Sequence, residues 1–514
     1  MSFLRTVHAE WTKLRTVRGW VSGLLAVAVV IIAFGLAPSR TGSCGQNGPG
    51  SECVTLHGPE GQEVVDNSTY VYRTLTGDGS ITVRLADFAG LLPTFDGPKT
   101  RDGLAPWAKA GLMVKDGTTA GSAYAAVMLT GEHGVRMQYN YVHDEGGSAA
   151  AHVKPQPVWL RLTRTGDTVK AEQSADGRAW AQVGTARLPG LPSTVTAGMF
   201  ATSPQYSEQV NESVVLSGVS GGPSVAMGSF ERPTTTGSWS PDWESAAAEV
   251  KADAGEQPKP GGTTARSEGP QTGFEQTADG WSLTGSGDVG PAVSGAAGGG
   301  VTISQTLVGT FLGLMLVAVV GAMFTAAEYR RGLIRTTLAA VPGRGRLLAA
   351  KAVVLGGVTF TLGLAAASVV VTFGQEVLRD NGVYVKPAST LTELRVAAGT
   401  ALLLAGCGAL AAGLGVLLRR GVTAVTAAIV VVVLPYLLSV TVLPLRASAW
   451  LLSVTPAAAF SLQQSESQYD QVDNIYSPAD GYFPLSAWGG LAVLAVWVAA
   501  VLGSAGYVLR RRDA

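Results

Sequence analysis

Long apolar segments without a charged residue are the dominant pattern along this chain of 514 residues. Six windows contain no Asp, Glu, Lys, Arg or His, and they are Val21–Ala37, Val301–Ala327, Ala352–Gln375, Val396–Leu418, Val422–Leu445 and Leu485–Leu509. A helix needs about 20 apolar residues to cross the hydrocarbon layer of a membrane. Five windows reach this length, and the first does so when Gly19 and Trp20 lie at the interface. A buried core helix would explain one window but not six, so the pattern predicts six transmembrane helices.

The basic residues between these windows are distributed unevenly. The segments before the first window, between the second and third, between the fourth and fifth, and after the sixth hold 15 Lys and Arg residues. The two short loops on the other side hold 4. The positive-inside rule therefore predicts that both termini are cytoplasmic and that residues 38–300 are extracellular. Because Ala33-Phe34-Gly35 is a weak cleavage site inside the apolar run, the first window is expected to remain as an anchor.

The polar insertion between the first two windows has the pattern of β-strands. Its short runs rich in Val, Tyr, Trp, Leu and Thr are Tyr124–Thr130, Val135–His143, Val158–Arg164, Thr168–Ser174 and Val195–Thr202. Turn sequences such as Asp176-Gly177 separate them. We expect an extracellular all-β sandwich over residues 38–218. Residues 219–300 are rich in Gly, Pro and Ser and are expected to be a linker, with a small β segment at 274–291.

The segments "APWAKAGLMVKDG", "GSAYAAVMLTGEHGVRMQYNYVHD", "WLRLTRTGDTV" and "SADGRAWAQVG" resemble the concanavalin A-like sandwiches of bacterial surface proteins, over about residues 70–218. The resemblance implies sugar binding or adhesion. The candidate ligand-site aromatics are Trp107, Tyr139, Tyr141 and Trp159, with Trp180 nearby. Each is also explained as a core residue of a strand. The Glu-x-Asp-x-x-Glu strand of the glucanase branch is missing from the sequence, so we expect no catalytic role for this domain.

Charge and cysteine content exclude several classes of protein. The 37 Lys and Arg residues balance the 37 Asp and Glu residues, which gives no basis for nucleic-acid binding. Three cysteines exclude a four-cysteine zinc site, and we predict no metal site. Cys44 and Cys53 lie in the predicted oxidising compartment, where a disulfide between them is favoured over two free thiols. Cys407 lies within the fourth window and is expected to be a packing residue.

Two motifs near the predicted cytoplasmic ends of the helices resemble those of type-2 ABC transporter permeases. One lies in "AMFTAAEYRRGLIRTTLAAVPGRGRLLAAKAVV", which matches the family's Glu-Tyr-x-x-Gly pattern and the Leu, Pro, Arg and Lys that follow at Leu338, Pro342, Arg346 and Lys351. The other is "HAEWTKLRTVRGWV", which is similar to the family's amphipathic elbow helix. The resemblance covers residues 1–37 and 301–514.

The resemblance implies a coupling helix at residues 326–343 that inserts into a groove of a separate ATPase subunit. The implied coupling residues are Glu328, Tyr329, Arg330, Arg331, Gly332, Arg335, Pro342 and Arg346. The implied elbow residues are Glu10, Lys13 and Arg15. Residues Ala449–Gln464, broken by Pro456, resemble the family's short re-entrant helices. Gly19/Gly23 and Gly309/Gly313 would permit close helix approach, and Pro435 would kink the fifth helix.

The function implied is that of a permease subunit of an ATP-driven exporter in a bacterial plasma membrane. Six helices would form half of a transporter, so a second permease chain, identical or different, is expected together with membrane lipid. The sequence has no phosphate-binding loop, so ATP and magnesium are expected in the partner subunit and not in this chain, which would not itself be an enzyme. The alternatives are a membrane-anchored carbohydrate-binding or sensor protein and an immunity factor against membrane-active peptides.

Overall fold

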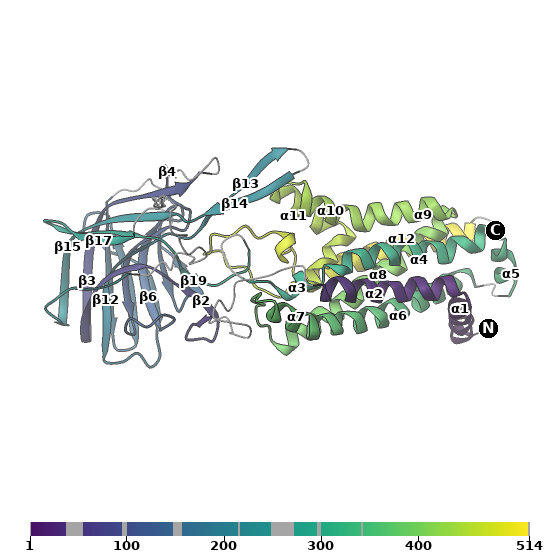
Figure 1. Cartoon of the computed structure of the whole chain (residues 1–514), viewed down its shortest axis with the longest axis horizontal. Coiled ribbons are helices and arrows are strands. Elements are labelled where there is room, and N and C mark those ends of the chain that lie inside the picture. Colours follow the sequence, from purple (N-terminus) through teal and green to yellow (C-terminus); the bar gives the residue numbers. More distant parts are fainter. Residues whose placement is uncertain are drawn as a thin grey trace, which may run out of the picture.

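The computed structural model has two parts, a β domain and a helical bundle, arranged along its long axis (Figure 1). It describes residues 2–37, 55–94, 100–147, 157–213, 216–247, 272–295, 300–330, 332–340 and 343–511. Cys44, Cys53 and their predicted disulfide lie outside these ranges.

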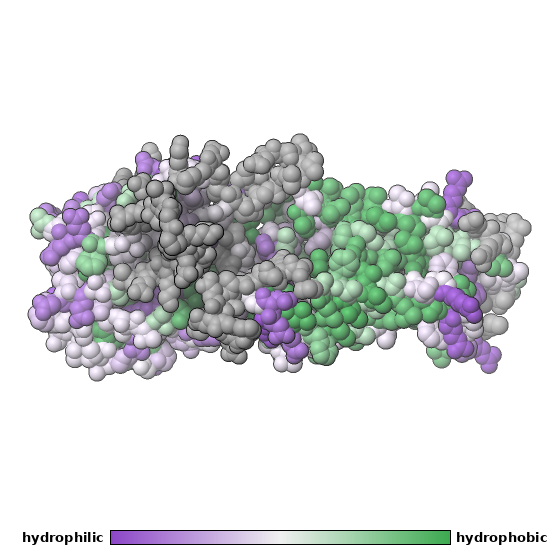
Figure 2. Space-filling view, viewed as in Figure 1, coloured by the Kyte–Doolittle hydropathy of each residue, from purple (hydrophilic) through white to green (hydrophobic). Residues whose placement is uncertain are grey.

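Six helical segments of the described residues are long and apolar enough to cross a membrane, which confirms the predicted number. They are α2 (Arg18–Leu36), α4 (Gly309–Arg330), α6–η2–α7 (Arg344–Val369, Val370–Gly374 and Gln375–Asp380), α8 (Thr390–Leu418), α9–η3–α10 (Gly421–Ala428, Ile429–Val433 and Leu434–Thr441) and α12 (Ala487–Arg511). The shorter helices are α1 (Phe3–Thr16), α3 (Ile303–Thr306), α5 (Leu333–Ala340), α11 (Leu445–Val454), η4 (Pro456–Gln463) and η5 (Pro478–Asp480). Figure 2 shows that the spanning segments form a continuous hydrophobic surface.

Both termini lie at the end of the bundle that is farthest from the β domain (Figure 1). We call it the terminal end, and the opposite end the β-domain end. The short helices α1 and α5 also lie at the terminal end. The β domain therefore lies beyond one end of the hydrophobic surface, and α1, α5 and both termini lie at the other end.

The second spanning helix begins later than the predicted Val301. The Val301 N–H instead donates to the Tyr384 carbonyl at 2.8 Å, in a short parallel bridge to Val385. Thr302 then begins α3 through a capping box with Gln305. These polar connections hold the start of the segment against the loop after α7, so α4 starts only at Gly309.

Two spanning segments contain π-helical turns, and the 3₁₀ helix η4 follows α11. The turn η3 ends two residues before Pro435, which has no N–H to donate to the carbonyl of Val431 four residues earlier. The predicted irregularity in the fifth helix thus takes the form of a wider turn before the proline. The predicted break at Pro456 separates α11 from η4, whose residues are all buried.

The glycine pairs lie where α2 meets α4. A Cβ atom at Gly309 would lie 2.8 Å from the backbone of Ile31, and one at Gly313 would lie 2.9 Å from the Ile31 side chain. A Cβ atom at Gly23 would lie 3.0 Å from Val320. Gly19, the fourth member of the two motifs, has open space around it. Three of the four glycines therefore permit close helix packing.

The β domain is built on one large antiparallel sheet. Its main path follows the strand order β11-β10-β9-β3-β12-β5-β6-β7-β8. These strands are β3 (Thr69–Pro93), β5 (Lys109–Lys115), β6 (Tyr124–Thr130), β7 (Val135–Tyr139), β8 (His143–Gly146), β9 (Val158–Thr165), β10 (Thr168–Ser174), β11 (Ala181–Arg187) and β12 (Thr194–Thr202). The other strands are β1 (Leu56–His57), β2 (Glu63–Asp66), β4 (Thr100–Asp102), β13 (Tyr206–Ser213), β14 (Leu216–Gly222), β15 (Val225–Trp239), β16 (Glu244–Ala247), β17 (Gly273–Gln276), β18 (Gly280–Gly285) and β19 (Val289–Pro291).

Burial in these strands follows the sequence pattern. In β9, Leu160 and Leu162 enter the main core while Trp159, Arg161 and Thr163 are only half-buried. All residues of β5 and β6 are buried, because two separate cores cover the two faces of these strands. Such strands appear as continuous apolar runs without alternation.

Residues 219–300 differ from the predicted linker. Strand β15 pairs with β3 and with β18, and β16 also pairs with β3. Strand β17 pairs with β18, and β19 pairs with β2. Within the described residues this region therefore belongs to the β domain, including the predicted small segment at 274–291. Composition was misleading because Gly228 and Gly280 occupy crowded sites, where an added Cβ would lie under 3.0 Å from Phe230.

We predict that Gly309→Val destabilises the bundle by about 1–3 kcal/mol, because the new side chain must displace the backbone of Ile31. Gly19→Val, in the Gly19/Gly23 motif of α2, is the matched control, since nothing lies within 4 Å of the Cβ position at Gly19. Thermal unfolding of the purified protein in detergent measures both. Equal stability of the two variants would contradict the close packing of α2 on α4.

Candidate functional site

A buried network of two acids and two lysines joins three helices at the terminal end. The Lys351 ammonium of α6 lies 2.7 Å from Glu10 Oε2 of α1 and 2.7 Å from Glu328 Oε1 of α4. Lys13 of α1 contacts the same two carboxylates at 2.7 and 3.2 Å. The Lys351 ammonium also lies 4.9 Å from the centre of the Phe324 ring. We call these four charged residues the elbow network, since they fix α1 against the spanning helices.

The two lysines of the elbow network differ in their exposure. The side chain of Lys351 is 3% exposed and that of Lys13 is 41% exposed. Burial alone lowers the pKa of Lys13, but its hydrogen bond to Glu10 and the charges of Glu328 and Glu10 outweigh this effect, so the pKa is raised overall. Lys13 is therefore held in the charged form by the two carboxylates that it contacts.

The end of α4 turns sharply after the elbow network. Gly332 has a φ of +66°, a conformation that favours glycine, and its N–H donates to the Tyr329 carbonyl at 3.2 Å. The predicted single coupling helix over 326–343 is therefore divided between the end of α4 and the separate helix α5. The Arg419 guanidinium, in the turn between α8 and α9, lies 5.3 Å from the centre of the Tyr329 ring.

The predicted coupling residues are not all gathered in one place. Glu328 belongs to the elbow network, Tyr329 packs beside Arg419, and Gly332 forms the turn into α5. Arg330 and Arg335 lie on α4 and α5. Arg331 and Pro342 lie outside the described residues. Arg346 lines an open groove of about 600 Å³ with Phe3, Arg344 and Arg510, where α1, α6 and α12 meet.

The predicted elbow residues also lie in different surroundings. Glu10 and Lys13 enter the elbow network, whereas Arg15 is exposed. The sequence motif included Lys351 as a matching position, but only the structure shows that it is the central cation. The sequence feature that could have identified it is the position of Lys351 directly before the charge-free window that begins at Ala352.

The aromatic candidates of the β domain are mainly packing residues. Trp107 is 5% exposed and stacks on His133 at 3.9 Å between ring centres. Tyr141 is 1% exposed, and its hydroxyl donates to Asp66 Oδ2 at 2.8 Å. Tyr139 is half-buried and stacks on His143. Trp159 is half-buried on β9, which is not adjacent to the β7 strand of Tyr139 in the sheet. The described residues hold no group of three or more His, Cys, Asp or Glu side chains suited to a metal ion.

A second charged cluster joins the β domain to the bundle, and it was missed in the sequence. The Lys386 ammonium, in the loop between α7 and α8, lies 3.8 Å from Glu63 of β2 and 3.7 Å from Glu466 in the loop after η4. Tyr384 donates its hydroxyl to Glu63, and Tyr482 donates to Glu466 at 2.7 Å. Burial lowers the pKa of Lys386, and the two carboxylates partly offset that effect. We call these contacts the junction.

Asp473 lies in the same loop as Glu466 and carries a buried oxygen, Oδ2, with no partner among the described residues. Burial, together with the charges of Asp288 and Glu132, raises the pKa of Asp473 to about 6. Asp288 is itself paired with the fully buried Lys109 at 2.6 Å. The folded protein therefore keeps Asp473 protonated up to a higher pH than an exposed aspartate.

Six apolar spans, with the β domain beyond one end and the elbow network at the other, define a multi-pass membrane protein with a large inserted domain. A model of the ABC-2 family transporter proteins matches residues 123–514, which is more than half of the chain and includes part of the β domain. The chain thus belongs to the ABC-2 transporter family. The comparison with curated proteins gives no significant match.

Solved structures resemble only part of the chain. A functionally unknown protein from Saccharomyces cerevisiae is 16% identical with a TM-score of 0.21, over 32% of this chain and 73% of that one. The GH43 BlXynB protein from Bacillus licheniformis is 16% identical with a TM-score of 0.17, over 24% of each chain. The chain thus spans about a quarter of the latter protein's length. Neither likeness carries an argument about function.

We predict that Lys351→Met lowers the free energy of unfolding by about 3–5 kcal/mol, because it removes the buried cation of the two carboxylates and leaves them only the half-exposed Lys13. Lys13→Met removes a half-exposed cation from the same carboxylates and should cost about 1 kcal/mol or less. Thermal unfolding in detergent distinguishes the two variants. Losses of equal size would show that burial of Lys351 does not dominate the elbow network.

We predict that the contribution of Asp473 to the free energy of unfolding falls as the pH rises through about 6. Above this pH the buried carboxyl group loses its proton, and burial destabilises the charged form. Asp473→Asn should match the native protein near pH 4 and exceed it by about 1–2 kcal/mol at pH 7.5, after discounting for solvent screening. Asp470→Asn, at an exposed position in the same loop, is the control. Parallel pH profiles of unfolding for the native and Asp473→Asn proteins would refute this role.

Proposed function

We propose that the chain is the permease subunit of an ATP-driven ABC exporter, with the terminal end in the cytoplasm and the β domain outside the cell. Membership of the ABC-2 transporter family is the observation that carries the proposal. Family membership also favours a transport function over the alternative of a membrane-anchored binding protein, because such a protein would need only one span. A separate ATPase subunit would bind ATP and magnesium, and this chain would transmit its motion to the membrane.

The terminal end has features that suit contact with a second protein. The short helix α5 lies at this end, and its first residue, Leu333, is 48% exposed. An exposed apolar side chain on a short helix beyond the spanning segments supports docking of the ATPase at α5.

The weakly buried spanning helices support pairing with a second permease chain. Only 11% of the apolar stretch of α12 and 22% of that of α2 are buried within this chain. Lipid and a second chain would cover the remaining surface. On the other side of the membrane, the β domain would form a surface module, for which we retain the concanavalin A-like sandwich as the proposed fold.

A substitution on α5 tests the proposal better than one in the elbow network, because changing buried Glu328 would also disturb folding. Leu333→Glu should abolish stimulation of the cognate ATPase in reconstituted vesicles, since it places a charge on the proposed docking surface. Leu391→Glu is the matched control, because Leu391 is 79% exposed on α8 at the β-domain end. If Leu333→Glu keeps normal stimulation while the ATPase remains bound, α5 is not the coupling element.

A further inference from the structure

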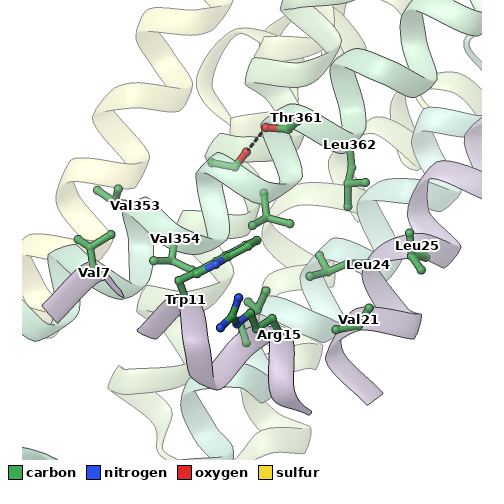
Figure 3. Close-up of a pocket in the computed structure, with 13 residues that line it drawn as sticks. Val7, Trp11, Arg15, Val21, Leu24, Leu25, Val353, Val354, Thr361 and Leu362 are labelled. Carbon is green, nitrogen blue, oxygen red and sulfur yellow. Dashed lines mark hydrogen bonds between the residues drawn. The ribbon is translucent and has the colours of Figure 1, made fainter. Parts of the chain in front are cut away.

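An apolar groove of about 650 Å³ opens between α1, α2 and α6. Val7, Trp11 and Leu14 line it from α1, and Leu24 and Leu25 line it from α2. Val353, Gly357 and Thr361 form the wall on α6. Figure 3 shows Trp11 beside Val354, with Arg15 close to Trp11.

The shape and chemistry of the groove suit an extended hydrocarbon chain. At 1.5 Å per residue, the wall of α6 from Val353 to Thr361 is about 12 Å long. The Thr361 hydroxyl already donates to the Gly357 carbonyl at 2.8 Å. The remaining lining side chains are apolar except for that of Arg15. The groove is therefore almost entirely apolar, and its polar groups are the Trp11 indole N–H and the Arg15 guanidinium.

The surroundings also indicate a lipid. Leu25 is 52% exposed and Val353 is 54% exposed, and both lie on helices that span the hydrophobic surface. Arg15 is exposed at the end of α1, and Arg18 is exposed at the start of α2. Cations close to the membrane surface attract acidic headgroups. An acyl chain would cover the apolar walls while its headgroup meets the arginines.

We propose that this groove binds one acyl chain of an acidic phospholipid, whose phosphate is held by Arg15. The lipid would support α1 on the face next to the elbow network, because Val7, Trp11 and Leu14 line the groove while Glu10 and Lys13 pair with α4 and α6. The proposal does not depend on coupling to an ATPase, so the two can fail separately.

Native mass spectrometry of the full chain tests the proposal, with phosphatidylglycerol and phosphatidylcholine added in turn. The native protein should retain phosphatidylglycerol about five- to tenfold more tightly. Gly357→Leu should abolish retention of both lipids, because its Cβ position points into open space within the groove. Gly503→Leu is the matched control on α12, where nothing lies within 4 Å of the new Cβ. Arg15→Gln should keep lipid binding but remove the preference for phosphatidylglycerol.

Three results would overturn the proposal. Equal lipid retention by the Gly357→Leu and Gly503→Leu proteins would show that the lipid lies elsewhere. Equal affinity of the native protein for the two lipids would remove the role of Arg15. A dimer that Gly357→Leu dissociates would assign the groove to a second copy of this chain. If Gly357→Leu lowers the unfolding temperature, Val353→Trp fills the same groove from a half-exposed position and replaces it.

Discussion

The pairing of Lys351 with two carboxylates is the interaction on which the terminal end depends. An ammonium group that is 3% exposed is stable only when acids compensate for its lost hydration. Glu10 and Glu328 supply them from α1 and α4, so the position of α1 is fixed relative to the end of α4. The turn at Gly332 and the start of α5 follow directly from that end. The buried Lys351 thus ties α1 to the end of α4.

A buried lysine between two carboxylates is also found at the β-domain end. Lys386 lies between Glu63 of the β domain and Glu466 of the bundle, as Lys351 lies between Glu10 and Glu328. At each end one lysine connects elements that are far apart in the sequence. Both clusters are buried, so they are expected to resist screening by salt better than exposed pairs do.

The sequence predicted the parts of this architecture that depend on local pattern. Charge-free windows identified all six spans, and alternation in β9 identified a strand with one half-exposed face. Composition failed for β15, because its glycine and threonine residues pair with the distant strand β3 and so depend on contacts that no local window contains. The junction was missed for the same reason. Lys386 appeared as an ordinary loop lysine, and its partners Glu63 and Glu466 lie far away in the chain.

The candidate site was only partly visible in the sequence. The motif around Glu328 was found by resemblance, but the separate roles of Glu328, Tyr329 and Gly332 are visible only in the structure.

The central claim is that α5 faces the cytoplasm and is covered by an ATPase. Labelling of Thr336→Cys, an exposed position on α5, with a membrane-impermeant maleimide tests it most directly. The account predicts labelling only in inside-out vesicles and protection when the ATPase is present. Labelling from the outside of intact cells would contradict it.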